Sequence, residues 1–428
     1  MDHQTRYEFK QSDTCYPTRI SRRTRFAQRI LLKLTPNEDI NVFISYWFRR
    51  IRTVHFETFL HIVKSSLGSG LLATPDAFKN AGIGLGLVGM AVAVLVITHA
   101  TSILVSILLS PFKLLKFVKV FSVITYYGVN TVYVVLIASS AKQLIENHIE
   151  WSLNIRWYIL LVLVLILPLG IIKLMKFLAP FSAIANVCLF VGLGIILFKI
   201  MDDLPPLSER PLVAPIEKVP LFFATMLFGL EGIGTVSVFS FAFNFRCIYF
   251  LALPYVSMFF IGLVNAIVGL FGYWKYGDAV CGSISLNMEQ DWLSELVKFL
   301  IAVAILFTYG LQMTVTSEVV WDSVQDNFHK DNSKVAYYCV RASLVVGTAI
   351  VAAIIPNLAP IISLFGAIGF SMLGLFCPAV IDFVLFYDVE KGLTDWRCWK
   401  NILLIIAAFS ATFLGAYTSL ADIISNYN

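Results

Sequence analysis

Charged residues are scarce in this sequence, and their scarcity excludes a soluble globular protein. Asp, Glu, Lys and Arg make up 14% of the 428 residues, whereas hydrophobic residues make up 58%, which leaves too little polar surface to cover a water-exposed fold. Runs without any charged residue extend over 84–110, 177–198, 247–274, 299–317 and 401–421. Since roughly 17–25 mostly apolar residues cross the hydrocarbon core of a bilayer, the sequence predicts an all-α integral membrane protein embedded in the lipid bilayer.

Catalytic motifs and metal-ligand spacings are also missing from the sequence. We find no Ser-His-Asp ordering, no GxSxG, no P-loop, no HExxH and no glycine-rich dinucleotide turn after a strand. Seven cysteines occur, but none of them form a CxxC pair or have a metal-binding spacing. We therefore expect no enzyme activity, no metal site and no cofactor.

The N-terminal segment 1–56 lacks an early apolar core and carries eleven Lys and Arg residues, so we interpret it as a cytoplasmic tail rather than a secretory signal peptide. Across the chain, 22 of the 32 Lys and Arg residues fall in segments predicted to face the cytoplasm, and seven in segments predicted to face outward. Positive residues concentrate on the cytoplasmic side of membrane proteins. The bias predicts a cytoplasmic N-terminus and an outer or luminal C-terminus, and it explains the net charge of +5 without a nucleic-acid partner.

Hydropathy and loop punctuation predict eleven transmembrane helices. They lie near 57–77, 83–110, 117–143, 157–173, 178–200, 218–241, 247–273, 293–318, 335–355, 359–385 and 401–422. The predicted regions are helices 1–5 at 57–201, an outer loop at 202–216, helices 6–10 at 217–385 and helix 11 at 400–424. Because each half has an odd number of spans, the second half inserts upside down, which predicts a 5+5 inverted repeat plus one helix.

Two predicted spans in matching positions of the halves are interrupted by glycine. Helix 1 contains Gly68-Ser69-Gly70, and helix 6 contains FGLEGIG at 228–234. Interrupted spans in matching places indicate a transporter binding site. If helix 1 unwinds there, freed N–H groups can hold a carboxylate and freed C=O groups an ammonium, and an amino acid carries both. The competing interpretation is that the small residues only allow close helix packing.

Ionisable residues also occur within these spans. One face of helix 1 carries Glu57, His61, Lys64 and Gly68, which follow one another at intervals of four, three and four residues. His61 is a candidate proton carrier because an unperturbed imidazole titrates at about pH 6.5. The alternative is a structural histidine whose hydrogen bonds are satisfied in the bundle core. Glu231, midway along helix 6, is a candidate for proton exchange or for orienting a ligand amine, or else part of a structural ion pair. His99 in helix 2 is a further proton-coupling candidate.

Several longer motifs are specific enough to indicate a family. They are HIVKSSLGSGLLATP at 61–75 with KNAG at 79–82, FGLEGIG at 228–234, GYWKYGD at 272–278 with GSISLN at 282–287, and PNL at 356–358. This set, spread over nearly all of 57–424, resembles the proton-coupled amino-acid transporters of the amino acid/auxin permease group. The resemblance implies a fold of the amino acid–polyamine–organocation type. It also implies symport of a small neutral amino acid and a proton by alternating access, driven by a proton gradient.

The resemblance implies particular site residues as well. The family's proton-linked histidines of helices 1 and 2 fall on His61 and His99, and its helix 6 acid falls on Glu231. Its substrate-binding backbone in helix 1 falls on 65–70. The predicted substrate-binding set is Ser65, Ser66, Gly68, Ser69, Gly70, Phe228, Glu231 and Gly232.

The chain departs from this family at the end of helix 6. Family members usually carry PLENxM there, followed by a basic, polar loop, whereas this chain has VFSFAFNFR at 238–246. Together with the long tail, the departure motivates a second hypothesis, a non-transporting amino-acid sensor that signals to a partner at the N-terminal tail. A sodium-driven carrier is a third hypothesis. Either a plasma membrane or a lysosomal or endosomal membrane fits proton coupling, because each has an acidic face.

Overall fold

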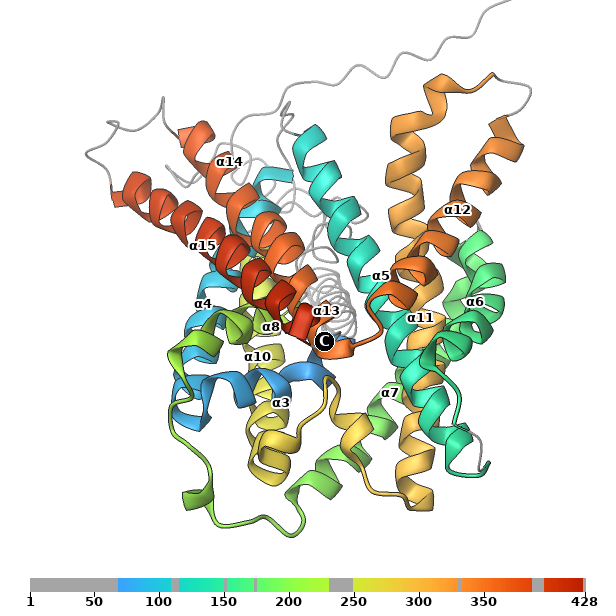
Figure 1. Ribbon diagram of the computed structural model, residues 1–428. Helices are drawn as coiled ribbons and strands as arrows, with labels where there is room; N and C mark the ends of the chain where they lie inside the picture. The colour runs from blue at the N-terminus through green and yellow to red at the C-terminus, as the bar shows by residue number, and fades with distance from the viewer. Residues whose placement is uncertain are drawn as a thin grey trace, which may run out of the picture. The chain divides into compact units, whose positions relative to one another are not determined.

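The structure is a computed structural model that describes residues 68–108, 115–149, 152–172, 175–230, 249–329, 333–386 and 396–425. All of these residues belong to one compact unit, Thr58–Asn428. The predicted tail at 1–56 lies outside the described residues. The described part of the chain is helical and contains no strand (Figure 1), which confirms the predicted all-α class.

The first half of the chain forms five described helices. They are α3 (Ser69–Ala81), α4 (Ile83–Leu108), α5 (Leu115–Glu146), α6 (Ile155–Ile171) and α7 (Met175–Met201). The bounds of α4 to α7 differ from the predicted ones by at most three residues. α3 covers the second part of the span predicted near 57–77, whose first part lies outside the described residues.

The second half adds seven described helices, and short 3₁₀ turns lie in some of the connections. The helices are α8 (Val219–Gly229), α10 (Tyr249–Tyr276), α11 (Trp292–Val324), α12 (Ser333–Ile354), α13 (Leu358–Phe365), α14 (Cys377–Phe386) and α15 (Trp396–Ser425). The turns are η1 (Leu207–Glu209), η2 (Ile216–Lys218), η3 (Gly277–Ala279), η4 (Ile284–Asn287) and η5 (Gln325–Asn327). Eight described helices are long and apolar enough to cross a membrane. The count of eleven spans and the inverted repeat stay predictions.

The helix predicted near 359–385 has an irregular middle. α13 continues into the π-helical segments η7 (Gly366–Phe370) and η8 (Met372–Phe376) before α14 begins. A Cβ atom at Gly366 would lie 1.9 Å from the carbonyl oxygen of Ala224, so the backbone of η7 packs directly on α8. π-Helical turns inside α-helices frequently occur at functional sites.

The described helices pack in two groups. In the first group α3, α4, α8 and α10 contact one another, and in the second α5, α6, α11 and α12 do, with α7 packed on α11. α13 and η7 contact both α8 and α5, so they join the groups. Figure 1 shows α14 and α15 side by side, and these two helices also contact each other.

A fully buried arginine holds the second group together. Arg341 on α12 has no exposed surface, and its guanidinium donates to the carbonyl oxygens of Gly170 and Ile172 at the end of α6, at 2.9 and 3.0 Å. It also donates to Thr314 Oγ1 on α11 at 3.0 Å. The last carbonyl groups of a helix lack partners within the helix. Arg341 therefore satisfies the end of α6 while joining three helices.

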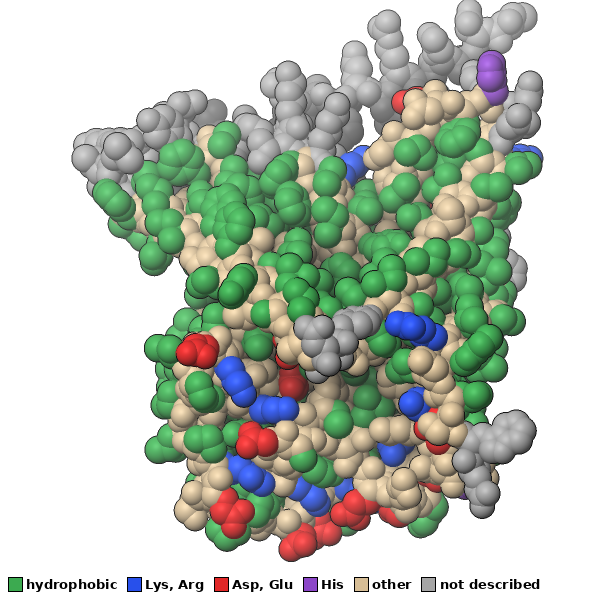
Figure 2. All heavy atoms as spheres, viewed as in Figure 1, with side chains coloured by type: hydrophobic (Ala, Val, Ile, Leu, Met, Phe, Trp, Pro, Cys, Tyr) green, Lys and Arg blue, Asp and Glu red, His purple; other side chains and the backbone are tan. Residues whose placement is uncertain are grey.

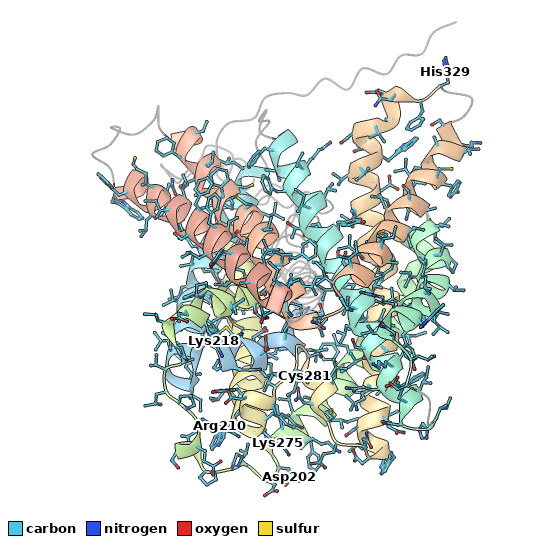
Figure 3. All side chains as sticks on the ribbon, viewed as in Figure 1. Asp202, Arg210, Lys218, Lys275, Cys281 and His329 are labelled. Atoms are coloured by element: carbon cyan, nitrogen blue, oxygen red, sulfur yellow. The ribbon has the colours of Figure 1, made fainter. Side chains whose placement is uncertain are left out.

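Charged side chains fasten the connection between α7 and α8 to neighbouring helix ends. Lys199, near the end of α7, lies 2.5 Å from Asp291 Oδ1, and Asp291 caps α11 by accepting hydrogen bonds from Ser294. Lys275, near the end of α10, donates to the carbonyl oxygens of Lys199 and Asp202 at 2.8 and 3.0 Å. In the view of Figure 2, acidic and basic side chains gather in the lower part, where Figure 3 labels several of these residues.

Arg210 in the same connection caps α10. Its guanidinium donates to the carbonyl oxygens of Trp274 and Lys275 at 3.0 and 3.3 Å. Gly277, which follows, has φ +55°, and a Cβ atom there would lie 2.3 Å from the guanidinium. Glycine is required at this position both by the backbone angle and by the close approach of Arg210. The segment predicted as an outer loop at 202–216 is thus tied to the end of α10.

Asp291 generates a testable prediction about pH. Hydrogen bonds from Lys199 and Ser294 lower the pKa of Asp291 to about 2. A carboxyl with a depressed pKa contributes its stability above its unfolded pKa of about 3.9 and loses it only as the pH falls through its folded pKa. We therefore expect Asp291→Asn to lower the melting temperature of the detergent-solubilised protein by similar amounts at about pH 7.5 and pH 5.

The control for this measurement is Glu217→Gln, because Glu217 is exposed and has no ion pair in the described part of the chain. Its melting temperature should match that of the unchanged protein at both pH values. A difference for Asp291→Asn that disappears at about pH 5 would contradict the low pKa.

Candidate functional site

The start of α3 and the end of α8 meet at two glycines. A Cβ atom at Gly70 would lie 2.6 Å from Gly229 Cα and 2.8 Å from the carbonyl oxygen of Phe228. A Cβ atom at Gly229 would lie 3.3 Å from the carbonyl oxygen of Gly70. The two backbones are therefore in direct contact, which any larger residue at position 70 would prevent. The glycine-interrupted stretches predicted to cooperate are brought together by the fold.

α3 begins within the buried part of the molecule without a side-chain cap. Gly68 precedes it in an extended conformation, with φ −120° and ψ −147°. The first N–H groups of a helix have no partner within the helix, and they form its positive end. The hydroxyl oxygen of Ser69 is buried and has no hydrogen-bond partner among the described residues. Together these donors are suited to a carboxylate.

Pro75 affects the next turn of α3. Proline has no N–H group, so the carbonyl oxygen of Leu71 loses its usual helical partner. The hydroxyl of Thr74 donates to that oxygen at 2.8 Å. The helix therefore continues through Pro75 to Ala81, and its free donors are confined to its first turn.

α8 presents the opposite end of a helix dipole. It ends at Gly229, and Leu230 follows with the N–H group bonded to the carbonyl oxygen of Met226 at 2.9 Å. Carbonyl groups of a last turn carry the negative end of the dipole and can accept from an ammonium group. The positive start of α3 and the negative end of α8 thus lie against each other, and a zwitterion matches this arrangement.

Side chains from three other elements surround this contact. On α5, the hydroxyl of Tyr133 would lie 3.5 Å from a Cβ atom at Gly68. On α10, Asn265 Oδ1 would lie 3.5 Å from a Cβ atom at Gly229, and this oxygen is buried without a hydrogen-bond partner in the described ranges. The ring of Phe228 packs edge-on against Phe370 in η7, with the ring centroids 5.5 Å apart.

The structure describes some of the predicted site residues, and others lie outside the described ranges. Of the five that it describes, Gly68, Ser69, Gly70 and Phe228 lie together at the α3–α8 contact. The predicted residues that lie outside the described residues are His61, Ser65, Ser66, Glu231 and Gly232, and the divergent segment 238–246 lies outside as well. The fifth described residue of the prediction, His99, contacts Lys400 on α15 rather than the glycine pair.

Three residues at this contact were not singled out from the sequence. Asn265 is an amide within the uncharged run 247–274, and a polar residue inside a span is a functional signal. Tyr133 and Phe370 carry no such signal, since aromatic residues are abundant in this chain. Only the packing of α5 and η7 against α3 and α8 identifies them.

A buried carboxylate lies further along α3. Asp76 is 7% exposed, and the charged groups around it are Lys79, Lys218 and Asp422. Lys79 also donates to the carbonyl oxygen of Val280 at 3.2 Å. Figure 3 labels Lys218 beside α8. The half-helix that starts at the glycine contact therefore ends in a mixed group of charges drawn from several elements.

The glycine contact predicts the effect of adding single methyl groups. Gly70→Ala and Gly366→Ala would each place a Cβ atom within 3 Å of a backbone atom of α8, and overpacking of this kind costs about 1–3 kcal/mol. We expect both variants to unfold at lower temperature in detergent than the unchanged protein. Gly194→Ala is the control, because no atom lies within 4 Å of its added Cβ. Equal melting temperatures for Gly70→Ala and Gly194→Ala would contradict the contact.

Sequence comparison shows which known proteins this chain resembles. A sequence model of the family described as "Transmembrane amino acid transporter protein" matches residues 52–421. The chain is 31% identical over 411 residues to the proton-coupled amino acid transporter-like protein pathetic of Drosophila melanogaster, which covers 88% of this chain and 86% of the relative. It is 26% identical over 405 residues to the amino acid transporter AVT3B of Arabidopsis thaliana, covering 86% of this chain and 93% of the relative.

The matches confirm the family that the motifs at 61–82 and 228–234 indicated. They extend over nearly the whole helical part of the chain, and the described helices include spans that can cross a membrane. The chain therefore belongs to the transmembrane amino acid transporter family.

Proposed function

We propose that this protein carries small neutral amino acids together with protons across a membrane by alternating access. The observation that carries the proposal is the contact between the uncapped start of α3 and the end of α8 at Gly70 and Gly229. Membership of an amino acid transporter family supports it, as does the similarity to a Drosophila relative named as proton-coupled.

The substrate's charged groups would bind the two helix ends. Its carboxylate would accept from the first N–H groups of α3 and from the hydroxyl of Ser69, which has no other partner among the described residues. Its ammonium would donate to carbonyl oxygens of the last turn of α8 and to Asn265 Oδ1. Opposite helix ends bind opposite charges, so the site selects a zwitterion. Ser65, Ser66 and Gly232 would complete it.

Aromatic packing favours a small side chain. Phe228 and Phe370 are 0% and 1% exposed, and their rings contact each other. Gly366 lies against both Ala224 and Phe228, so η7 cannot move closer to α8 without steric overlap. A substrate beside Phe228 would have little space for a long side chain, which favours glycine, alanine or proline.

The proton would be carried by side chains of the interrupted spans. His61 is the proposed carrier because an imidazole titrates near the physiological pH range. Glu231 would exchange protons or orient the substrate amine, and His99 would respond to protons at a second position. The energy comes from a proton gradient, without a metal ion or cofactor.

The proposed orientation places the N-terminus in the cytoplasm and the 202–216 connection on the acidic side. That side is either the exterior of the cell or the lumen of a lysosome or endosome. The bias of Lys and Arg residues toward segments on the cytoplasmic side supports this orientation. Alternating access would then move α3 and α8 relative to the α5, α6, α11 and α12 group.

The proposal predicts acid-stimulated uptake. Cells that lack endogenous transport and express this protein at the surface should take up labelled glycine, alanine or proline faster at about pH 5.5 than at pH 7.5, with an inward current. Replacing sodium with choline should leave uptake unchanged, and leucine and phenylalanine should compete poorly. A surface-expressed protein that binds these amino acids without uptake or current would overturn the symporter proposal and favour the sensor hypothesis.

The role of His61 has a separate prediction. His61→Ala should abolish the acid stimulation of uptake, because the proposed proton carrier is lost. His148→Ala is the matched control: His148 is an exposed histidine paired with Glu295 at 3.2 Å, and its loss should leave the stimulation in place. An unchanged pH dependence in surface-expressed His61→Ala would remove His61 from the mechanism.

A further inference from the structure

Side chains of three helices meet in a partly buried polar cluster around His99. On α4, His99 Nε2 lies 3.1 Å from Lys400 Nζ of α15. The same ammonium lies 3.1 Å from Asp382 Oδ2 of α14, and Asn401 donates to that oxygen at 2.8 Å. Asp382 and Asn401 are 7% and 2% exposed. Lys400 directly precedes the span predicted near 401–422, and Asp382 lies close to the end of the span predicted near 359–385.

The hydrogen bonds decide the protonation state of His99. A lysine ammonium has three donors and no acceptor, and the ammonium of Lys400 forms an ion pair with the Asp382 carboxylate at 3.1 Å. His99 Nε2 must therefore accept the hydrogen bond, which requires a neutral imidazole with its proton on Nδ1. A proton bound at Nε2 would turn this acceptor into a donor and place two cations 3.1 Å apart. Protonation of His99 and its contact with Lys400 exclude each other.

Few other polar groups lie close to His99 among the described residues. Ser102 Oγ donates to the carbonyl oxygen of His99 at 2.7 Å and lies 3.1 Å from the hydroxyl of Tyr255 on α10. The ring of Trp396 lies 5.8 Å from Lys400 Nζ. From α3, α8 and η8, which also pack on α4, no charged group among the described residues acts on His99; the charges that do are Lys400 and Asp382.

The hydrogen bond joins α15 to α4, and both helices also contact α8 and α14. α4 packs with α3, α8 and α10, the group that contains the α3–α8 site, whereas α15 contacts α8, α13 and α14. A hydrogen bond from α15 to α4 therefore links a helix of the site group to one outside it. Breaking that bond would free α4 from α15 at this point.

We propose that Lys400 and Asp382 are positioning residues that keep His99 neutral, so that a proton arriving at His99 Nε2 breaks the contact between α4 and α15. The effect on transport rests on the proposed proton-coupled function, but the protonation state of His99 can be measured without transport. When the proton binds, Lys400 keeps its ion pair with Asp382, and the α4–α15 hydrogen bond is lost.

The first test compares pH profiles of uptake. Lys400→Met removes the donor and the cation beside His99, so half-maximal uptake should shift to higher pH by about one unit. Lys400→Arg keeps the charge and should retain the original profile. Asp382→Asn leaves the ammonium beside His99 without its counter-ion, so the profile should shift to lower pH. In a His99→Gln background, Lys400→Met should cause no further shift; a full shift there would overturn the proposal.

The second test reads His99 directly. The protein has six histidines, so ¹⁵N-histidine labelling in nanodiscs with His99→Gln as the assignment control identifies one imidazole by NMR. We expect the neutral form protonated on Nδ1 at about pH 7, and a titration midpoint about one pH unit higher in Lys400→Met. An imidazolium at about pH 7, or an unmoved midpoint, would overturn the proposal.

The two tests separate failure of this inference from failure of the proposed function. Absence of uptake by the unchanged protein, with the NMR shift present, would refute proton-coupled transport and support the His99 assignment. Acid-stimulated uptake with an unmoved His99 midpoint would support transport and refute the role of Lys400 and Asp382.

Discussion

The cost of an unpaired backbone group in hydrocarbon constrains this protein more than any other interaction. Each such group costs several kcal/mol, so irregular backbone inside a membrane persists only where protein or a polar cavity satisfies it. α3 starts without a cap after Gly68, and α8 ends at Gly229. The two ends lie against each other, so the donors of one and the acceptors of the other face the same place.

The absence of side chains at a few positions makes this arrangement possible. Gly70 and Gly229 let the two helix backbones touch, and Gly366 lets the π-helical η7 reach the backbone of α8. Ser371, which directly follows η7, forms a hydroxyl–hydroxyl hydrogen bond with Thr412 of α15 at 2.6 Å. Close backbone contact fixes the position of the helix ends better than flexible side chains would, because few alternative packings are available.

Charged side chains form a second layer of organisation, since several of them join different elements. Arg341 satisfies the end of α6, Asp291 joins α7 to α11, and Lys400 joins α14 to α15 and reaches α4. Removing one partner of a buried pair leaves an uncompensated charge, which is more costly than losing the pair. The proton-coupling role of His99 stays a prediction, and its imidazole lies in a polar network that joins three helices.

The amino-acid sequence by itself determined the all-α membrane class, the positions of most helices and the glycine-interrupted stretches, because hydropathy and chain breaks are local properties. The family could also be recognised from motifs. The tertiary structure alone decided that Asn265, Tyr133 and Phe370 surround the glycine contact and that His99 lies within hydrogen-bond distance of Lys400. Those partners lie on helices far apart in the chain, and their side chains meet only through the packing geometry, which local periodicity does not encode. His61 and Glu231 lie outside the described residues, and their roles stay predictions from the sequence.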